Sequence, residues 1–377
     1  MKLCATVAEF NPFHNGHKYL VDNFKDKYDG TIAIMSGNFV QRGAPSIYNK
    51  FSRAHAAVEG GVDLVIELPL IYALSSAETF ALGAIKTLNA TNCIDTLFFG
   101  SEKGEIYPLR AAAEISANET DVFRETLKEK LSAGLSYPKA LGESYHLVGI
   151  EDDVISSPNN ILGIEYIKAL IKTNSPIKPA TLKRFGASHD SSVTSQSIAS
   201  ASHVRALIES GNLANDYIPQ FSYSSPVFDR HFSDIILYAV KSATYDDFLS
   251  IPDCSESLAS RFVSASAETT TEAVISSVKS KNFTESRIRR ILWNLVLKNS
   301  ISPLTDPTYI RVLAQNKRGS QIISCMKERS SLPVIQKCAR LKDDEIFRVE
   351  ARATDIYNIP LNLPSGEEYR YSPVPIL

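Results

Sequence analysis

Short β-branched and apolar runs alternate with amphipathic stretches through the first 100 residues. This alternation is typical of βαβ units, in which parallel strands form a sheet and helices cover its faces. The strands are expected at residues 3–8, 31–35, 63–68 and 96–99, and the helices at residues 18–25, 49–59 and 77–88.

A mostly helical insertion is expected at residues 108–149, where the alternation is interrupted. A strand at 177–182 and a helix that begins at Ser200 or Ser202 then complete the predicted domain, residues 1–211. The N-terminal domain is therefore predicted to be an α/β fold with a parallel sheet.

Helical spacing predominates beyond about residue 212, for example at 234–241 and 286–298. We therefore expect a second, mostly helical domain over residues 212–377. Trp293 and Tyr309 are expected to pack in a core rather than to stack on bases.

Composition places the chain among ordinary globular proteins: 44% of its 377 residues are apolar, 22% are charged, and the net charge is -2. The five cysteines are scattered without a C-x-x-C pair, which favours a reducing compartment, and Cys4 is expected in the core. The apolar run at residues 3–8 is too short for a signal-peptide core. The sequence thus predicts a cytoplasmic protein without a membrane span.

Two histidines, His14 and His17, stand where the first strand passes into the first helix, with Gly16 between them. A helix N-terminus attracts phosphate, and two imidazoles at that turn can donate to the same phosphate group. A glycine lets a nucleotide lie against the backbone. The spacing alone also allows a helix cap beside a surface histidine. A zinc site lacks partners, because no cysteine or carboxylate cluster stands at ligand spacing, so no resident metal is predicted.

A second phosphate-binding sequence is Ile198-Ala199-Ser200-Ala201-Ser202-His203-Val204-Arg205. It combines a helix N-terminus, two hydroxyl groups and a guanidinium group, which suits an outer phosphate of a nucleotide. Taken alone, Ser200 or Ser202 would be an ordinary N-cap.

These two sequences resemble the H-x-G-H and I-S-S-T-x-x-R motifs of the nucleotidyltransferase superfamily, although Ala201 replaces one serine. The superfamily has the Rossmann-like HUP fold of class I aminoacyl-tRNA synthetases. Longer strings resemble the bacterial tRNA(Met) cytidine acetate ligases. They are Glu9-Phe10-Asn11-Pro12-Phe13-His14-Asn15-Gly16-His17, Ser36-Gly37-Asn38-Phe39-Val40-Gln41-Arg42-Gly43, Asp63-Leu64-Val65-Ile66-Glu67-Leu68-Pro69, Pro158-Asn159-Asn160-Ile161-Leu162-Gly163 and Arg184.

The resemblance implies an enzyme that activates acetate with ATP and transfers the acetyl group to the exocyclic amine of the wobble cytidine in elongator tRNA(Met), releasing AMP and pyrophosphate. Magnesium is expected to accompany the ATP. Two other functions stay open: a small-molecule adenylyltransferase of the same superfamily, and a non-catalytic RNA-binding protein on this scaffold.

The resemblance also implies site residues. His14, His17 and Arg205 would be catalytic. The ATP site would comprise Val7, Ala8, Glu9, Phe10, Asn11, Pro12, Phe13, His14, Asn15, Gly16, His17, Lys18, Tyr19, Leu20, Gly100, Asn160, Arg184, Phe185, Ser200 and Ser202. The sequence does not decide between Asn159 and Asn160 as the nucleotide ligand.

The loop after the second predicted strand contains Gln41 and Arg42, which we expect to close over the acyl end of the adenylate. Lys50 and Arg53 follow at i,i+3 spacing on the next helix, a pattern more typical of a solvated face. Asp63 and Glu67 flank or occupy a buried strand and are expected to be structural.

Basic side chains are concentrated at residues 281–342, where 13 Lys and Arg stand against three Asp and Glu, a net charge of +10. Such an asymmetry favours a polyanion, although solvated helix faces would produce it too. With the resemblance, tRNA is the expected partner. The residues predicted to contact it are Arg287, Arg289, Arg290, Lys317 and Arg318.

Overall fold

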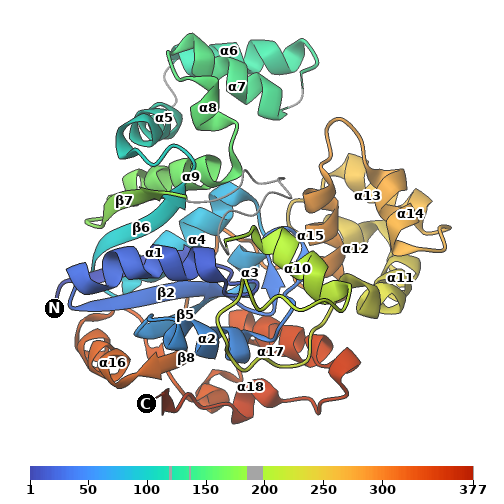
Figure 1. Ribbon diagram of the computed structural model, residues 1–377. Coiled ribbons are helices and arrows are strands. Elements are labelled where there is room, and N and C mark those ends of the chain that lie inside the picture. Colours follow the sequence, from blue (N-terminus) through green and yellow to red (C-terminus); the bar gives the residue numbers. More distant parts are fainter. Residues whose placement is uncertain (119–120, 136, 185–197, 377) are drawn as a thin grey trace.

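The computed structural model describes residues 1–118, 121–135, 137–184 and 198–376 (Figure 1). Within these ranges one sheet has the strand order β10-β8-β5-β2-β1-β6-β7, and β9 pairs with β8. Its strands are β1 (Leu3–Ala8), β2 (Gly30–Ser36), β5 (Leu64–Leu68), β6 (Ile94–Ser101), β7 (Lys178–Lys183), β8 (Ile310–Asn316), β9 (Val334–Ile335) and β10 (Pro375–Ile376). A two-stranded hairpin, β3 (Phe39–Val40) and β4 (Ala44–Pro45), follows β2.

The predicted parallel strands are confirmed. β1 pairs in parallel with β2 and with β6, β2 with β5, and β6 with β7. The carboxyl ends of parallel strands lie at one edge of a sheet, where ligands of α/β proteins bind. The loops after β1, β6 and β7 therefore meet at one edge.

Eighteen α-helices occur in the described ranges, and three of them are only four residues long. In chain order they are α1 (Asn15–Phe24), α2 (Lys50–Glu59), α3 (Leu70–Ala73), α4 (Ala77–Ala90), α5 (Ile106–Asn118), α6 (Asp121–Ser132), α7 (Tyr137–Leu147), α8 (Asp152–Ile155), α9 (Pro158–Lys172), α10 (Ala201–Glu209), α11 (Ser233–Ser242), α12 (Tyr245–Leu249), α13 (Glu256–Ala265), α14 (Thr271–Val278), α15 (Glu285–Val296), α16 (Lys317–Arg329), α17 (Glu345–Tyr357) and α18 (Glu367–Arg370).

Both faces of the sheet are apolar, because successive side chains of a strand point to opposite faces. Cys4 and Ala33 join the core under α1 and α2. Leu3, Ala5 and Ile32 belong to the core on the other face, with α4, α9 and α16. Cys4 is fully buried, which confirms its predicted place in the core.

The expected insertion is helical. Helices α5 to α8 lie between β6 and α9, and Figure 1 shows α6, α7 and α8 beyond α9, away from the sheet. Helices α11 to α15 form another group, at the right of Figure 1, around a core that contains Phe232, Phe248 and Trp293. Trp293 and Tyr309 are buried, as predicted.

The last part of the chain differs from the expected C-terminal domain of residues 212–377. Strand β8 pairs with β5 in antiparallel orientation, and β10 pairs with β8, so this segment completes the N-terminal sheet. Residues 310–314 are a short buried run, and hydrophobic periodicity does not separate such a run from a buried helix segment. The boundary near residue 212 stays a prediction.

None of the helices in the described ranges is both long enough and apolar enough to cross a membrane.

Candidate functional site

The loop between β1 and α1 holds both motif histidines in fixed orientations. His14 is the N-cap of α1, and its Nδ1 accepts a hydrogen bond from the Gly16 amide at 3.0 Å. The Nδ1 of His17 accepts from the His14 amide at 3.2 Å, which completes a reciprocal capping box. An Nδ1 that accepts requires the proton on Nε2, so each imidazole keeps one Nε2–H donor for a ligand.

Gly16 allows this arrangement. A Cβ at Gly16 would lie 2.8 Å from Cε1 of His14, closer than a real Cβ approaches. The two imidazole rings lie with centroids 3.9 Å apart. A larger residue would therefore displace the His14 ring from its neighbour.

Both histidines are neutral near pH 7. Burial, followed by the charges of Arg184 and Arg205, lowers the pKa of His14 to about 3. Burial, His14 and Arg184 hold the pKa of His17 well below its ordinary value. The pair thus offers donors rather than cations.

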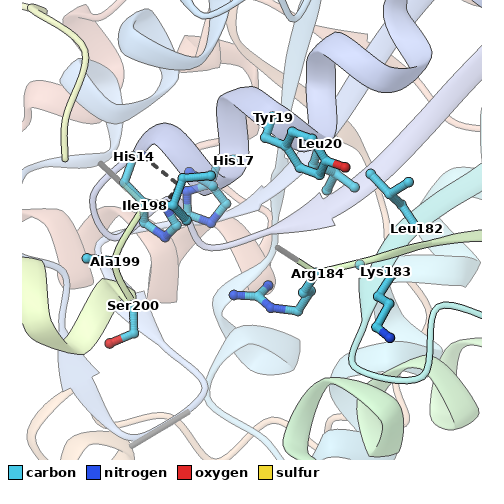
Figure 2. A pocket seen from close by; sticks show the side chains of 12 residues that line it. His14, His17, Tyr19, Leu20, Leu182, Lys183, Arg184, Ile198, Ala199 and Ser200 are labelled. Carbon is cyan, nitrogen blue, oxygen red and sulfur yellow. Dashed lines mark hydrogen bonds between the residues drawn. The ribbon is translucent and has the colours of Figure 1, made fainter. Parts of the chain in front are cut away.

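A cavity opens beside these rings, with an empty volume of about 530 Å³ including the part open to solvent. Figure 2 shows His14, His17, Arg184 and Ser200 around it. Its lining residues are His14, Gly16, His17, Tyr19, Leu20, Gly100, Leu182, Lys183, Arg184, Ile198, Ala199 and Ser200.

Arg184 follows β7 and brings a guanidinium group to the cavity. In the described parts of the chain this group has no hydrogen-bond or ion-pair partner, and burial lowers its pKa. The Arg184 side chain is nevertheless exposed to solvent, so the guanidinium is accessible to an anion and can donate two parallel hydrogen bonds to a phosphate. Gly100 leaves room for it, because a Cβ there would lie 3.1 Å from Cγ of Arg184.

The second motif meets the first. Ser200 caps α10 by accepting from the His203 amide at 3.2 Å. Arg205 donates to the Asn11 carbonyl at 2.8 Å and to Oγ of Ser202 at 3.2 Å. The guanidinium of Arg205 therefore joins α10 to the loop before α1. Ser200 lines the cavity, whereas Ser202 and Arg205 do not.

Further contacts from residues 212–224 hold the same loop. The Asn15 amide donates to the Tyr217 carbonyl at 2.9 Å, and the Asn15 side chain donates to the Asp216 carbonyl at 2.9 Å. The hydroxyl of Tyr223 donates to the Phe13 carbonyl at 3.2 Å. These contacts use backbone carbonyls, so the sequence carried no side-chain signal for them.

The remaining residues expected at the ATP site have different surroundings. In the segment from Val7 to Leu20, the side chains of Tyr19 and Leu20 line the cavity, whereas Lys18 pairs with Asp22 on an exposed face of α1. Phe185 lies outside the described residues. The lining residues Leu182, Lys183, Ile198 and Ala199 were not predicted, although they adjoin predicted ones.

Asn160 is fully buried and holds a loop. Its Oδ1 accepts from the amides of Glu102 and Lys103 at 2.9 and 3.1 Å, and its Nδ2 donates to the Asp153 carbonyl at 3.0 Å. Asn159 donates to Glu102 at 2.5 Å. Neither asparagine lines the cavity, and a nucleotide contact by Asn160 stays a prediction.

Lys50 and Arg53 are not on a solvated face; that interpretation is wrong. Both side chains are fully buried. Lys50 forms ion pairs with Glu67, Glu350 and Glu368, and Arg53 donates to backbone carbonyls. Spacing along one helix could not reveal partners that come from α17 and α18. Glu67 is structural, as predicted, and Asp63 accepts from the Thr31 amide at 2.9 Å.

Sequence comparison agrees with this geometry. The HIGH Nucleotidyl Transferase family matches the chain over residues 1–370. A Thermoanaerobacter sp. (strain X514) protein named tRNA(Met) cytidine acetate ligase is 39% identical over 384 residues, covering 95% of each chain. One of the same name from Clostridium perfringens (strain SM101 / Type A) is 35% identical and covers 99% of each. The chain belongs to the tRNA(Met) cytidine acetate ligase family.

A solved structure of the tRNA(Met) cytidine acetate ligase family has the same fold. The apo crystal structure of Thermotoga maritima TmcAL is 31% identical, covers 99% of both chains and superimposes with a TM-score of 0.91. A second crystal structure of that protein, with the same values, is bound with alpha-thio ATP. The α/β fold with a helical C-terminal region is thus that of the ligase family.

The arginines of α15 that we expected to contact tRNA are engaged within the protein. Arg287 lies 3.1 Å from Asp253, and Arg289 lies 3.2 Å from Asp229. Arg290 is buried and donates to the Gln41 carbonyl at 3.4 Å. Lys317 and Arg318 are exposed at the start of α16. Contact with tRNA stays a prediction for all five.

Of the 13 basic residues behind the charge of +10, Arg311 is buried. It pairs with Glu67 and Glu368, so it contributes to the core and not to a surface for a polyanion.

The loop with Gln41 and Arg42 contacts Glu9, just before the histidine loop, but neither residue lines the cavity. The Gln41 amide donates to Oε1 of Glu9 at 2.9 Å. Arg42 is exposed. Burial lowers the pKa of Arg205, and the positive charge of Arg42 lowers it further. Its role at an acyl end stays a prediction.

Proposed function

We propose that this chain is an ATP-dependent acetate ligase. It forms acetyl-adenylate from acetate and ATP and acetylates N4 of the wobble cytidine in elongator tRNA(Met), releasing AMP and pyrophosphate. The observation that carries the proposal is the convergence on one cavity of two neutral imidazoles and of Arg184, which has no partner among the described residues. The names of the relatives and the alpha-thio ATP bound to TmcAL support it.

In the first step an acetate oxygen attacks the α-phosphorus of ATP, a new oxygen–phosphorus bond forms, and the bond to pyrophosphate breaks. Negative charge increases on the phosphate oxygens, where the Nε2–H groups of His14 and His17 can donate. Arg184 supplies the positive charge that the neutral histidines lack. The step needs no proton transfer, so low histidine pKa values do not impede it.

The start of α10 would hold the outer phosphates. Ser200, Ser202 and the free amides of the first turn form a site for an anion, and Arg205 adds a cation. Pyrophosphate would leave on this side.

In the second step the exocyclic amine of cytidine attacks the acetyl carbonyl, the bond between the acetyl carbon and the AMP oxygen breaks, and the amine releases one proton to solvent. No acyl-enzyme is required, and none of the cysteines in the described ranges lines the cavity. Gln41 and Arg42 would cover the acyl end. Lys317, Arg318 and the exposed parts of Arg287 and Arg289 would contact the tRNA backbone.

Magnesium would enter with the triphosphate. Within the described ranges no group of three or more His, Cys, Asp or Glu side chains is placed to hold a metal ion. No step above depends on a resident metal ion. We place the reaction in the cytoplasm, in line with the scattered free cysteines.

The test is incubation of the protein with elongator tRNA(Met), ATP and labelled acetate, followed by nucleoside mass analysis. Label in N4-acetylcytidine, together with released AMP, is the expected result. Unmodified tRNA in the presence of a product that retains AMP would replace the proposal with a small-molecule adenylyltransferase. Binding of tRNA without ATP turnover would leave only an RNA-binding scaffold.

A further inference from the structure

Arg53 on α2 is an arginine without an acidic partner. Its side chain is fully buried, and in the described parts of the chain no carboxylate forms an ion pair with it. Burial lowers its pKa to about 10, so it stays charged at neutral pH. A charged group this far from water persists only where many hydrogen bonds compensate the lost hydration.

The guanidinium group donates hydrogen bonds to backbone carbonyls in three segments of the chain. Nε donates to the Tyr48 carbonyl at 2.9 Å. Nη1 donates to the Glu9 carbonyl, and Nη2 donates to the carbonyls of Ser36, at 3.1 Å, and Gly37. Glu9 directly follows β1 and leads into the histidine loop, and Ser36 is the last residue of β2. One planar group therefore joins the exits of two adjacent parallel strands.

The histidine loop is held to the same segments by further bonds. The Ile47 amide donates to Oδ1 of Asn11 at 2.8 Å, next to the Asn11 carbonyl that Arg205 occupies. The Gln41 amide donates to the Glu9 carboxylate at 2.9 Å. A shift of the loop after β2 would therefore be transmitted to the residues just before His14.

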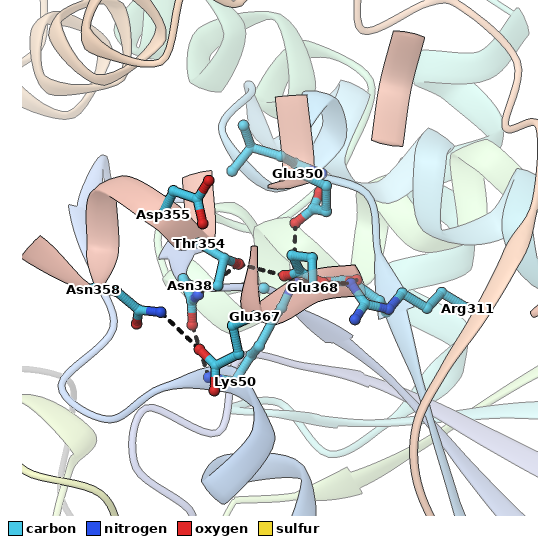
Figure 3. A network of polar contacts seen from close by, with 12 residues as sticks. Asn38, Lys50, Arg311, Glu350, Thr354, Asp355, Asn358, Glu367 and Glu368 are labelled. Carbon is cyan, nitrogen blue, oxygen red and sulfur yellow. Dashed lines mark hydrogen bonds and ion pairs between the residues drawn. The ribbon is translucent and has the colours of Figure 1, made fainter. Parts of the chain in front are cut away.

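The C-terminal region also holds the loop after β2, through a contact between Asn38 and Thr354 of α17. Figure 3 shows Asn38 beside Thr354, Glu368 and Lys50. The Asn38 amide group donates to the Thr354 hydroxyl at 3.0 Å, and its Oδ1 accepts from the Lys50 amide at 2.8 Å. The Thr354 hydroxyl donates to Glu368, which pairs with Lys50. This loop is thus held by α2 and α17 together.

We propose that Arg53 is a positioning residue of the adenylation site, which sets the histidine loop against the loop of residues 36–46, with the Thr354–Asn38 contact as its counterpart from the C-terminal region. The proposal rests on the proposed function. A lysine cannot replace the arginine, because a guanidinium presents five donors in a fixed plane and an ammonium presents three on one nitrogen.

The experiment measures acetate-dependent exchange of labelled pyrophosphate into ATP by the full chain. Arg53→Lys should lower kcat by about 10²-fold, the loss expected for a reacting geometry displaced by about 1 Å. The dissociation constant of ATP should change less than kcat, because Arg184 and Ser200 are not among the groups that Arg53 contacts.

The matched control is Arg352→Lys. Arg352 also donates to backbone carbonyls, those of Leu297 and Lys298 at 2.8 and 3.1 Å, but these follow the end of α15 and do not belong to the site. A wild-type kcat in folded Arg53→Lys overturns the proposal. So does an equal fall of kcat in Arg352→Lys at equal folded fraction, because that would be a loss of structure in general.

Thr354→Val tests the same loop if Arg53→Lys does not fold. It removes one hydroxyl at nearly constant volume, and we expect faster amide hydrogen exchange at residues 36–46 with a several-fold lower kcat. Faster exchange with an unchanged kcat would overturn the proposal, and so would unchanged hydrogen exchange.

Failure of the proposed function gives a different result. Wild-type protein without acetate-dependent exchange refutes acetate activation. Amide hydrogen exchange at residues 8–18 and 36–46 still tests the role of Arg53 in that case. If both segments of Arg53→Lys exchange as slowly as in the wild-type protein, Arg53 does not position them.

Discussion

The cavity beside His14 and the ion network around Lys50 both withdraw ionisable groups from water, but they balance charge in opposite ways. In the network, Lys50 and Arg311 stand against Glu67, Glu350 and Glu368, all almost fully buried. Burial and Glu67 hold the pKa of Glu350 well above its ordinary value, which favours the protonated form of this third carboxyl. The cations of the network are therefore matched by carboxylates.

The cavity leaves its charge unbalanced. Arg184 has no partner in the described parts of the chain, and the two histidines are neutral because their pKa values are lowered. Arg184 is exposed, and without an internal partner among the described residues its guanidinium can form an ion pair with a ligand. The comparison separates a charge cluster that stabilises the fold from one prepared for an anion.

Removing one cation from the network should have the largest effect. Lys50→Met leaves buried carboxylates without a partner and should lower the free energy of unfolding by roughly 3–5 kcal/mol. Urea denaturation measures the change. Lys18→Met, which breaks an exposed pair with Asp22, is the control and should change stability little. Equal effects of the two substitutions would show that the network is not the balanced cluster described above.

Removing one donor from the cavity should reduce activity rather than stability. His14→Ala or His17→Ala should lower acetate-dependent pyrophosphate exchange by about 10²–10³-fold, the usual loss for one donor to a transition state. The midpoint of unfolding should change much less than the activity, because burial of an imidazole is itself unfavourable and the substitution removes that cost. His146→Ala, at an exposed position, is the control. Exchange at the wild-type rate in either cavity variant would exclude this role.

Removing the unpaired cation should separate binding from folding. Arg184→Met should weaken ATP binding by about 10–100-fold, which corresponds to the loss of hydrogen bonds to a charged group. Calorimetry with ATP and thermal unfolding of the free protein measure the two effects. Arg348→Met removes an exposed arginine and should leave ATP affinity unchanged. A large loss of stability in Arg184→Met would mean that this arginine has an internal partner.

Acidification should produce the smallest effect. The pKa of His14 is about 3 in the folded protein and about 6.5 in the unfolded chain, so the unfolded chain takes up the proton first as pH falls below 6.5. Stability should therefore decrease by about 1.4 kcal/mol between pH 7.5 and pH 5.5 on account of this residue. His14→Gln should lose correspondingly less over the same interval in urea denaturation. Parallel pH profiles would show that His14 is accessible to water.

Much of the α/β region could be predicted because its signals are local. The strand β7 was expected at 177–182 and occurs at Lys178–Lys183, and Ser200 caps α10 as one of two expected starts. The three-residue separation of His14 and His17 sufficed to place both rings at one helix N-terminus. Local chemistry of this kind depends on neighbours in the chain.

Other features depended on partners hundreds of residues away. The short run in β8 becomes a strand because β5 offers a free edge. Arg290 follows the helical spacing of a surface arginine, yet it is buried against the loop that contains Gly43. Asn160 is predicted to contact the nucleotide, and nothing in the sequence indicated that its Oδ1 also accepts from the amides of Glu102 and Lys103.

By itself the sequence determined the order of strands and helices through the first 211 residues, the identity of the phosphate-binding motifs and the family. Those properties depend on hydrophobic periodicity and on short strings whose chemistry is contained within one turn of chain. Only the tertiary structure decided that Lys50 and Arg53 are buried, that the C-terminal strands complete the sheet, and that Arg184 has no partner among the described residues. Burial and charge compensation are set by what packs against a side chain, and here those neighbours come from distant segments.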